Sequence, residues 1–336
     1  MKTLVTGVPG WLGSRLTSVL TNPNDPLNHF SGYSDREVRC FVLPGMNATG
    51  INHAEIIAGD VRDADSLHRA LDGVETVFHL VGIIHPKKIS DLYAVNREGF
   101  RNLLNAAEAA GVRRVVFVSS NSPAGTNKNR NILMKESDTP QPYKHYGISK
   151  LEAEQIGLDF VKRGRIEVVI VRPCWFYGPG QPDRQTRFFR MIKSGKPLMF
   201  GDGKNLRSMS YVDNTIQGLL LAEKTPDISG RTYWIADEKP YSTEEIYWTI
   251  AELLDVRHLT PRHLPELVSK CCELADDLLQ AAGIYSQEIH VAGEMVKDIA
   301  CSIEKAKLEL GYAPEISLRE GMKRSIEWCR QRGDEI

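Results

Sequence analysis

Short apolar runs alternate with longer stretches of helical periodicity along the first half of the chain. Between the runs, leucines recur at helical spacing, as at Leu12, Leu16 and Leu20. This alternation predicts βαβ units and therefore a parallel sheet covered by helices on both faces. The runs are TLVT at 3–6, EVRCFVL at 37–43, TVFHLV at 76–81, RVVFVSS at 114–120 and IEVVIV at 166–171.

The pattern changes after Pro173. Loop-forming stretches separate isolated helical patterns, one more strand-like run lies at 231–236, and an amphipathic tail extends from Ser302 to Arg330. We therefore predict an α/β fold, with a Rossmann-type doubly wound parallel sheet and a smaller C-terminal α/β substrate-binding lobe. The expected cofactor domain is 1–172 with roughly 210–237, and the expected substrate lobe is 173–209 with 238–336.

Composition narrows the choice of partners. The 336 residues are 42% hydrophobic and 25% charged, and 42 Lys plus Arg balance 43 Asp plus Glu. No net field favours nucleic acid or an anionic membrane, so we expect neither as a partner. The six cysteines show no metal-binding spacing, and no apolar run approaches about eighteen residues. We expect a cytoplasmic protein with reduced thiols and no metal.

A glycine loop follows the first predicted strand, in the stretch TGVPGWLG. Gly7 permits a tight turn, Gly10 lets the backbone approach a pyrophosphate, and Gly13 allows the helix to pack closely on the sheet. The N-terminus of that helix, at Trp11 and Leu12, would then face the anion. A tight turn without a ligand is the alternative.

The Gly-x-x-Gly-x-x-Gly spacing resembles that of the extended short-chain dehydrogenase/reductase family, also called the NAD-dependent epimerase/dehydratase family. The resemblance extends over nearly the whole chain. It implies that Asp60, followed by Val61, holds the adenine amino group, although a turn or capping aspartate is the alternative. It also gives Asn96 a structural role. The expected strand end beneath the cofactor is Leu80, Val81 and Gly82.

The choice between NAD and NADP depends on the end of the second strand. An acidic residue there would bind the ribose hydroxyls, and an arginine would bind a 2′-phosphate. The chain has Val42 and Leu43 at this point. The missing arginine favours NAD, and NADP is not excluded.

Tyr146 and Lys150 are four residues apart in HYGISK, so on a helix they share one face. A nearby ammonium favours the phenolate of a tyrosine, which otherwise titrates near pH 10. The pair alone would equally suit an exposed helix surface.

The hydroxyls that end the run at 114–120 complete the family's catalytic triad. The resemblance makes Ser120 the partner of Tyr146, with Ser119 and Ser122 as less favoured alternatives. Ser120 and Ser122 would contact substrate, and Ser119 would contact the cofactor. Pro173 falls where the family passes backbone beside the nicotinamide.

Three further residues have competing interpretations. His85 and His145 may be read as lining the cleft, but a structural histidine is the favoured interpretation for both. Cys174 is better explained as a small buried side chain than as part of the pocket.

Two residues of the second lobe bear on the substrate. Arg207, in GDGKNLRSMSY, occupies the place where family members hold the diphosphate of a nucleotide sugar, and a guanidinium suits phosphate oxygens. A surface arginine is the alternative. Trp175 replaces an asparagine that is typical of nucleotide-sugar members, which suits a stacked base, a reshaped sugar pocket or a less polar substrate.

Asn121 and Ser122 stand where family dehydratases carry an Asp-Glu pair, so hydride transfer at a carbinol remains. We predict a nucleotide-sugar epimerase of the 4-epimerase type or a related oxidoreductase, with Tyr146, Lys150 and Ser120 as catalytic residues. The rivals are a 3β-hydroxysteroid dehydrogenase-like or other alcohol dehydrogenase, and a non-catalytic dinucleotide-binding scaffold. The resemblance also implies a homodimer formed through helices at 96–110 and 146–162.

Overall fold

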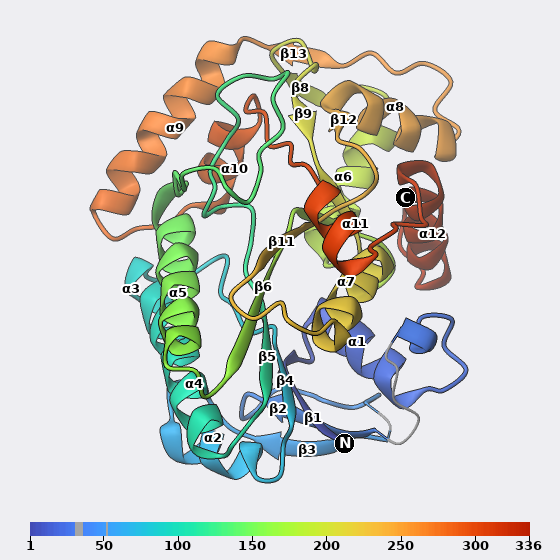
Figure 1. Ribbon diagram of the computed structural model, residues 1–336. Helices are drawn as coiled ribbons and strands as arrows, with labels where there is room; N and C mark the ends of the chain where they lie inside the picture. The colour runs from blue at the N-terminus through green and yellow to red at the C-terminus, as the bar shows by residue number, and fades with distance from the viewer. Residues whose placement is uncertain (31–35, 52) are drawn as a thin grey trace.

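A seven-stranded parallel sheet forms the centre of the protein. The computed structural model describes residues 1–30, 36–51 and 53–336. The sheet order is β11-β6-β5-β4-β1-β2-β3, and every neighbouring pair runs parallel (Figure 1). This arrangement confirms the predicted Rossmann-type fold. Its strands are β1 (Lys2–Val8), β2 (Glu37–Val42), β3 (Glu55–Ala58), β4 (Thr76–His79), β5 (Arg114–Val118), β6 (Glu167–Pro173) and β11 (Thr232–Ile235).

Both faces of the sheet are buried because successive strand residues enter different apolar clusters. Leu4 and Val115 pack with α2, α4 and α5 on one face, whereas Val5 and Val116 pack with α1, α7 and α11 on the other. The helices are α1 (Trp11–Thr21), α2 (Ala64–Leu71), α3 (Ile89–Leu92), α4 (Phe100–Ala109), α5 (Lys144–Lys162), α6 (Asp183–Lys193), α7 (Val212–Lys224), α8 (Thr243–Leu253), α9 (Glu266–Ala281), α10 (Gln287–Glu294), α11 (Glu304–Leu310) and α12 (Leu318–Gln331), with a 3-10 turn at Asn28–Phe30 and a π-helical segment at Tyr93–Gly99.

A separate apolar cluster supports the second lobe, most of which lies in the upper part of Figure 1. Three two-stranded ladders occur there, of which only β12–β9 is antiparallel. The strands are β7 (Trp175–Tyr177), β8 (Leu198–Phe200), β9 (Leu206–Arg207), β10 (Met209–Tyr211), β12 (Tyr241–Ser242) and β13 (Arg262–Leu264). The 231–236 run returns to the main sheet as β11. The domain boundaries remain a prediction.

The C-terminal tail differs from the single amphipathic stretch expected at 302–330. It forms α11 and α12, separated by a break at Gly311, which has a φ of +69°. Pro314 follows within the break, where its missing N–H prevents helical continuation. Within the described residues, no helix is long and apolar enough to cross a membrane.

Candidate active site

The glycine loop is closed by contacts between its own three glycines. Gly10 N donates to Gly7 O at 2.9 Å, and a Cβ built on Gly10 or Gly13 would lie 2.6 Å from that same oxygen. Gly7 has a φ of +79°, and a Cβ there would meet the backbone of Leu80 at 2.8 Å. Side chains are therefore excluded where β1 turns into α1, which leaves backbone N–H groups facing the end of β4.

Trp11 connects this loop to the second lobe. Its indole Nε1 donates to Pro179 O at 2.6 Å, and a Cβ on Gly180 would lie 2.9 Å from its ring. Leu12 packs against the apolar clusters of both the sheet and the second lobe. Both residues lie at the seam between the two parts of the protein, and no other predicted cofactor residue makes such a connection.

The loop after β3 is organised by Asp60. Its carboxylate accepts from Arg62 N at 2.9 Å and is gripped by the Arg62 guanidinium, with Nη2 at 2.5 Å. The Arg62 hydrogen bond is the main reason that the pKa of Asp60 falls. Asp60 therefore forms a turn, and an adenine amine would share its oxygens with Arg62. The Val61 side chain is buried beneath Gly99, which leaves only its backbone for a cofactor.

Asn96 clamps the loop after β4 to the catalytic helix. It exchanges hydrogen bonds with the backbone of Ile83 at 2.8 and 3.0 Å and donates to Ser149 Oγ at 3.1 Å. A Cβ on Gly82 would lie 3.7 Å from the Asn96 amide oxygen and 3.9 Å from Lys150 Nζ. Val81 is partly buried beside these residues. The clamp brings this loop against the amine of Lys150.

Tyr146 and Lys150 both lie on α5, as the i, i+4 interpretation requires. Lys150 is only 2% exposed, and its Nζ donates to Val118 O at 2.8 Å and lies 4.3 Å from the centre of the Phe117 ring. Burial lowers the pKa of Lys150 to about 7, although Glu154 opposes the shift. The surface-helix alternative is therefore excluded for the lysine.

Burial also raises the pKa of Tyr146, and a hydrogen bond with Ser120 lowers it. Ser120 is 8% exposed, and its Oγ lies 3.4 Å from Ser122 Oγ. Ser122 in turn accepts from Tyr143 N through its carbonyl. The structure thus brings Ser120, Ser122 and Tyr146 together at the carboxyl end of β5.

Ser119 faces a different environment from Ser120. Its hydroxyl donates to Glu154 Oε1 at 2.5 Å, and Arg172 holds the same carboxylate through Nε at 2.9 Å and Nη2 at 2.5 Å. All three residues are buried. The Ser119 hydroxyl is therefore committed to a buried ion pair behind Lys150. Pro173 follows Arg172 at the end of β6, and Cys174 beyond it is buried.

Arg207 and Trp175, which belong to different ladders, lie together in the second lobe. The Arg207 guanidinium carbon lies 5.7 Å from the centre of the Trp175 ring, and Nη2 donates to Glu294 O at 2.7 Å. Arg207 is 6% exposed, so the surface interpretation is wrong. Among the described residues it has no acidic partner, and its Nε has no hydrogen-bond acceptor. A buried cation without a counter-charge is costly, so this site favours an anion.

Comparison with known proteins identifies the family. A sequence model of the NAD dependent epimerase/dehydratase family matches residues 3–236. The chain belongs to this family. The match confirms the resemblance drawn from the glycine loop and the HYGISK stretch, and it makes the chain an NAD(P)-dependent enzyme of the extended short-chain dehydrogenase/reductase type.

Relatives within the family have diverse activities. An uncharacterized protein y4nL of Sinorhizobium fredii is 42% identical over 98% of this chain and 95% of its own length. A UDP-glucose 4-epimerase of Vibrio cholerae is 27% identical over 96% of this chain and 94% of its own length. A 3beta-hydroxysteroid-dehydrogenase/decarboxylase of Arabidopsis thaliana is also 27% identical, over 81% of this chain and 66% of its own length.

A solved structure also matches over the full length. MoeE5 in complex with UDP-glucuronic acid and NAD has a TM-score of 0.75 and 26% identity, covering 99% of this chain and 100% of that one. The agreement extends over both the sheet and the second lobe. This chain therefore has the complete two-part architecture of an extended family member.

Helices α9 and α10 contribute a wall of the site that sequence reasoning missed. His85 Nδ1 lies 2.8 Å from the Tyr285 hydroxyl, and Gln280 Oε1 accepts from His145 N at 3.3 Å. The His145 ring bonds the Tyr93 hydroxyl at 2.7 Å. Burial is the main cause that lowers the pKa of His85 to about 4, so this ring is neutral at neutral pH. Both histidines have structural partners, as the favoured interpretation holds.

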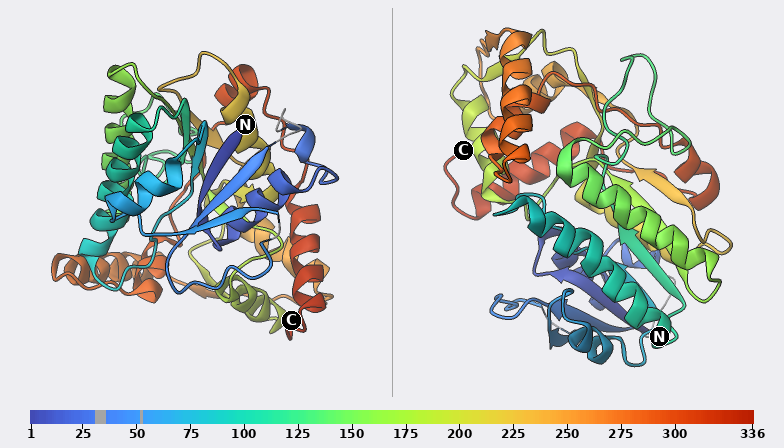
Figure 2. Two further views of the ribbon diagram at one scale, coloured as in Figure 1. Left: turned by 90° about the horizontal axis from the view of Figure 1, so that it is seen from below. Right: turned by 90° about the vertical axis from the view of Figure 1, so that its left-hand side faces the viewer.

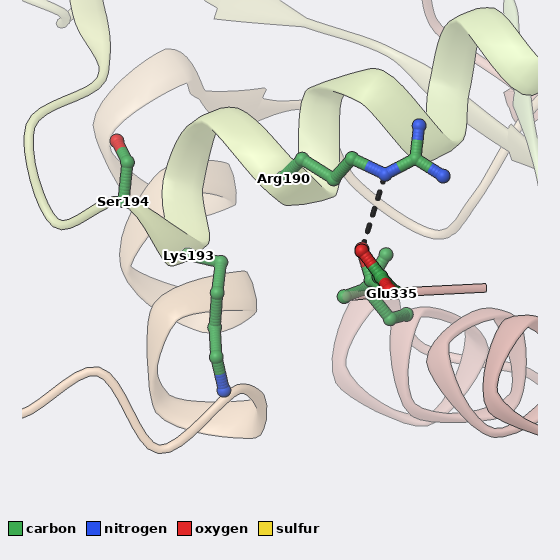
Figure 3. Close-up of a pocket in the computed structure, with 5 residues that line it drawn as sticks. Arg190, Lys193, Ser194 and Glu335 are labelled. Atoms are coloured by element: carbon green, nitrogen blue, oxygen red, sulfur yellow. Dashed lines mark hydrogen bonds between the residues drawn. The ribbon is translucent and has the colours of Figure 1, made fainter.

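A surface pocket far along the chain from the catalytic residues lies beside the C-terminus. It is lined by Arg190, Lys193 and Ser194 at the end of α6 and by Glu335 and Ile336 (Figure 3). Arg190 Nε donates to Glu335 O at 3.0 Å across it. None of the predicted site residues lines this pocket.

Proposed function

We propose that this enzyme uses NAD to oxidise and re-reduce a carbinol of a nucleotide sugar, in the manner of a UDP-sugar 4-epimerase. The buried Arg207 guanidinium carries the substrate assignment, because it faces the lobe interior without an acidic partner among the described residues. A diphosphate supplies the charge and the paired oxygens that a guanidinium fork binds. The family match and the UDP-sugar in the MoeE5 complex support this assignment.

The glycine loop fits NAD. Gly7, Gly10 and Gly13 leave no space for side chains, so N–H groups at the start of α1 can approach a pyrophosphate. Bound there, NAD would accept the hydride of the carbinol and return it. Leu43 is 48% exposed at the end of β2, and neither it nor Val42 offers a cation to a 2′-phosphate. That composition supports NAD over NADP.

The protein's own residues move the proton. Ser120 would hold the substrate oxygen, and Tyr146 would remove the hydroxyl proton as the carbon is oxidised and restore it on reduction. Lys150, buried one helical turn away, would provide positive charge and hold the nicotinamide ribose. Because burial raises the pKa of Tyr146, the phenolate depends on such positive charge and on the Ser120 hydrogen bond.

A less polar alcohol is the second candidate substrate. Trp175 is half-buried over Arg207 and lies 6.0 Å from Phe188, so the pocket has an apolar wall. The Arabidopsis relative supports the same alternative. Arg207→Ala separates the two, because only a diphosphate substrate loses most of its binding when the guanidinium is removed.

The identity of the bound molecules can be tested directly. The purified protein is denatured, and the released small molecules are identified by mass spectrometry. The proposal predicts NAD together with a nucleotide sugar, or NAD alone in a protein that then binds added UDP-glucose. NADP with an apolar alcohol in their place, or no dinucleotide even after incubation with one, would overturn it.

Three further expectations belong to this proposal. All six cysteines are free, which supports a reducing compartment such as the cytoplasm. Residues 1–172 with 210–237 would bind the cofactor, and 173–209 with 238–336 the substrate. The functional unit would be a homodimer.

A further inference from the structure

Helix α9 is oriented with its polar face inward and its apolar face outward. Ser269 and Asp276 are fully buried and Gln280 is 5% exposed, whereas Leu267 and Leu278 are each 68% exposed. Figures 1 and 2 show α9 at the periphery of the second lobe. An exposed apolar stripe of this kind indicates a surface that is covered by another body.

Hydrogen bonds fix this orientation. Asp276 Oδ2 lies 2.8 Å from His290 Nδ1, and its carboxylate accepts from Gln280 Nε2 at 2.9 Å. Ser269 Oγ donates to Ala292 O at 2.7 Å. Rotating the helix to bury its leucines would break all of these contacts and leave buried polar groups unpaired. The leucines therefore remain on the outside.

The exposed stripe has the spacing of a coiled-coil seam. Its members follow steps of four, three, four and three residues, which is a strict heptad a/d pattern. A surface helix that packs on its own domain usually has a wider apolar face. The stripe consists of Leu267, Cys271, Leu274, Leu278 and Ala281, all of them exposed.

Charges beside the stripe favour a second copy of this chain over a lipid surface. α9 carries one basic residue, Lys270, against four acidic ones, so an anionic membrane would repel it. Lys270 and Asp277 occupy equivalent heptad positions one repeat apart on the same side of the stripe. In an antiparallel pair these positions face each other, so each Lys270 would meet Asp277 of the partner subunit. The Asp277 side chain is 57% exposed despite its ion pair with Lys144.

We propose that α9 is a self-association surface on which two copies of this chain pack antiparallel about a twofold axis. Leu267 would lie against Leu278 of the partner subunit, and Cys271 against Leu274 of the partner subunit. Such an isologous seam is closed and stops at two chains. The helix is about 24 Å long, so the seam lies at or below the low end of stable interfaces, which bury about 1,200–2,000 Å² in total. The dimer is therefore concentration-dependent.

This surface is distinct from the helices at 96–110 and 146–162. Within the described chain, neither α4 nor α5 has an exposed large hydrophobic side chain, and ion pairs such as Arg97–Glu152 and Arg163–Glu108 cover them. The residues from 267 to 291 contribute six such side chains, namely Leu267, Val268, Leu274, Leu278, Ile284 and Val291. Apolar surface that needs covering is thus concentrated around α9.

Sedimentation equilibrium of the full-length protein tests the proposal. From roughly 1 to 100 μM, the average mass of the parent protein should rise from one chain towards two. The double variant Leu274→Glu with Leu278→Glu should remain a single chain over the same range. Leu308→Glu is the matched control, because Leu308 is 83% exposed on α11 and should leave dimerisation unchanged.

A cross-link tests the antiparallel register without depending on a weakened fold. Leu274→Cys places a thiol opposite Cys271 of the partner subunit, so mild oxidation should give a covalent dimer in much higher yield than in the parent or in Leu308→Cys. A parent protein that stays a single chain throughout overturns the proposal. So does a dimer that survives the double variant, or flotation with phosphatidylcholine vesicles that the double variant abolishes.

Discussion

Helices α5 and α9 both border the candidate site, yet they bury opposite kinds of side chain. α5 buries Ala153, Ile156 and Phe160 against the sheet, together with Lys150. α9 buries serine, aspartate and glutamine, and it exposes leucines. The first helix is held by the apolar core and carries a buried amine as its functional exception. The second is held by hydrogen bonds, and its exception is the uncovered apolar face.

The largest effect is expected from the exception on the α5 side. Tyr146→Phe removes the group that transfers the proton, so kcat/KM should fall by roughly 10²–10⁴ while NAD binding persists. Tyr93→Phe is the control, because that hydroxyl bonds His145 and does not belong to the triad. Steady-state rates for both variants decide the matter, and a Tyr146→Phe enzyme as fast as the control would refute the mechanism.

Arg207 tests the second lobe. Losing charge-assisted bonds worth about 1.5–3 kcal/mol should raise KM for a nucleotide sugar by roughly 10–100-fold in Arg207→Ala, with a smaller change in kcat. Arg262→Ala, which removes an exposed arginine of the same lobe, should change neither. Initial rates against substrate concentration measure the difference. Equal KM values for the two variants would contradict a diphosphate contact.

The inward polar face of α9 predicts a loss of stability. Asp276→Leu leaves His290 and Gln280 without their buried partner, so the free energy of unfolding should fall by about 1–3 kcal/mol. Leu274→Asn, on the outer face, should leave it nearly unchanged in dilute solution. Urea unfolding of both variants provides the measurement. The reverse ranking would show that α9 is not held by its polar side.

Lys150 sharpens the comparison through pH. The folded protein releases the Lys150 proton near pH 7, and the unfolded chain releases it near 10.5. Between these values the unfolded chain binds more protons, so the contribution of Lys150 to the free energy of unfolding rises with pH.

Replacing the amine removes that contribution. The melting temperature of Lys150→Met relative to the parent should therefore be highest near about pH 6 and should decline towards about pH 9. Lys162→Met, at an exposed lysine of the same helix, should show no such trend. Thermal melts across this range check the sign, and a difference that grows with pH would contradict a lowered pKa.

The same contrast explains what the sequence could predict. The glycine loop and the Tyr146–Lys150 pair are local, since their geometry follows from a turn and from helical spacing. The choice between Ser119 and Ser120 is not local, because it depends on Glu154 and Arg172 behind the sheet. Sequence spacing could indicate the triad but not which hydroxyl was already engaged.

The second lobe was less predictable for related reasons. Arg207 and Trp175 come from separate ladders, so their contact exists only in the folded chain. For α9, periodicity marks two faces and gives no sign of which one turns inward. The leucine spacing at 267–278 would have been interpreted as a core face, and the structure places it outside.

The most direct test of the central claim follows the hydrogen on the reacting carbon. UDP-glucose deuterated at C4 is incubated with the enzyme and NAD, and the products are analysed by NMR and mass spectrometry, with UDP-glucuronic acid treated in the same way. We predict a C4 epimer that keeps its deuterium, because the hydride is removed and returned within one site. Failure to convert either sugar nucleotide, with an apolar alcohol oxidised instead, would contradict the account.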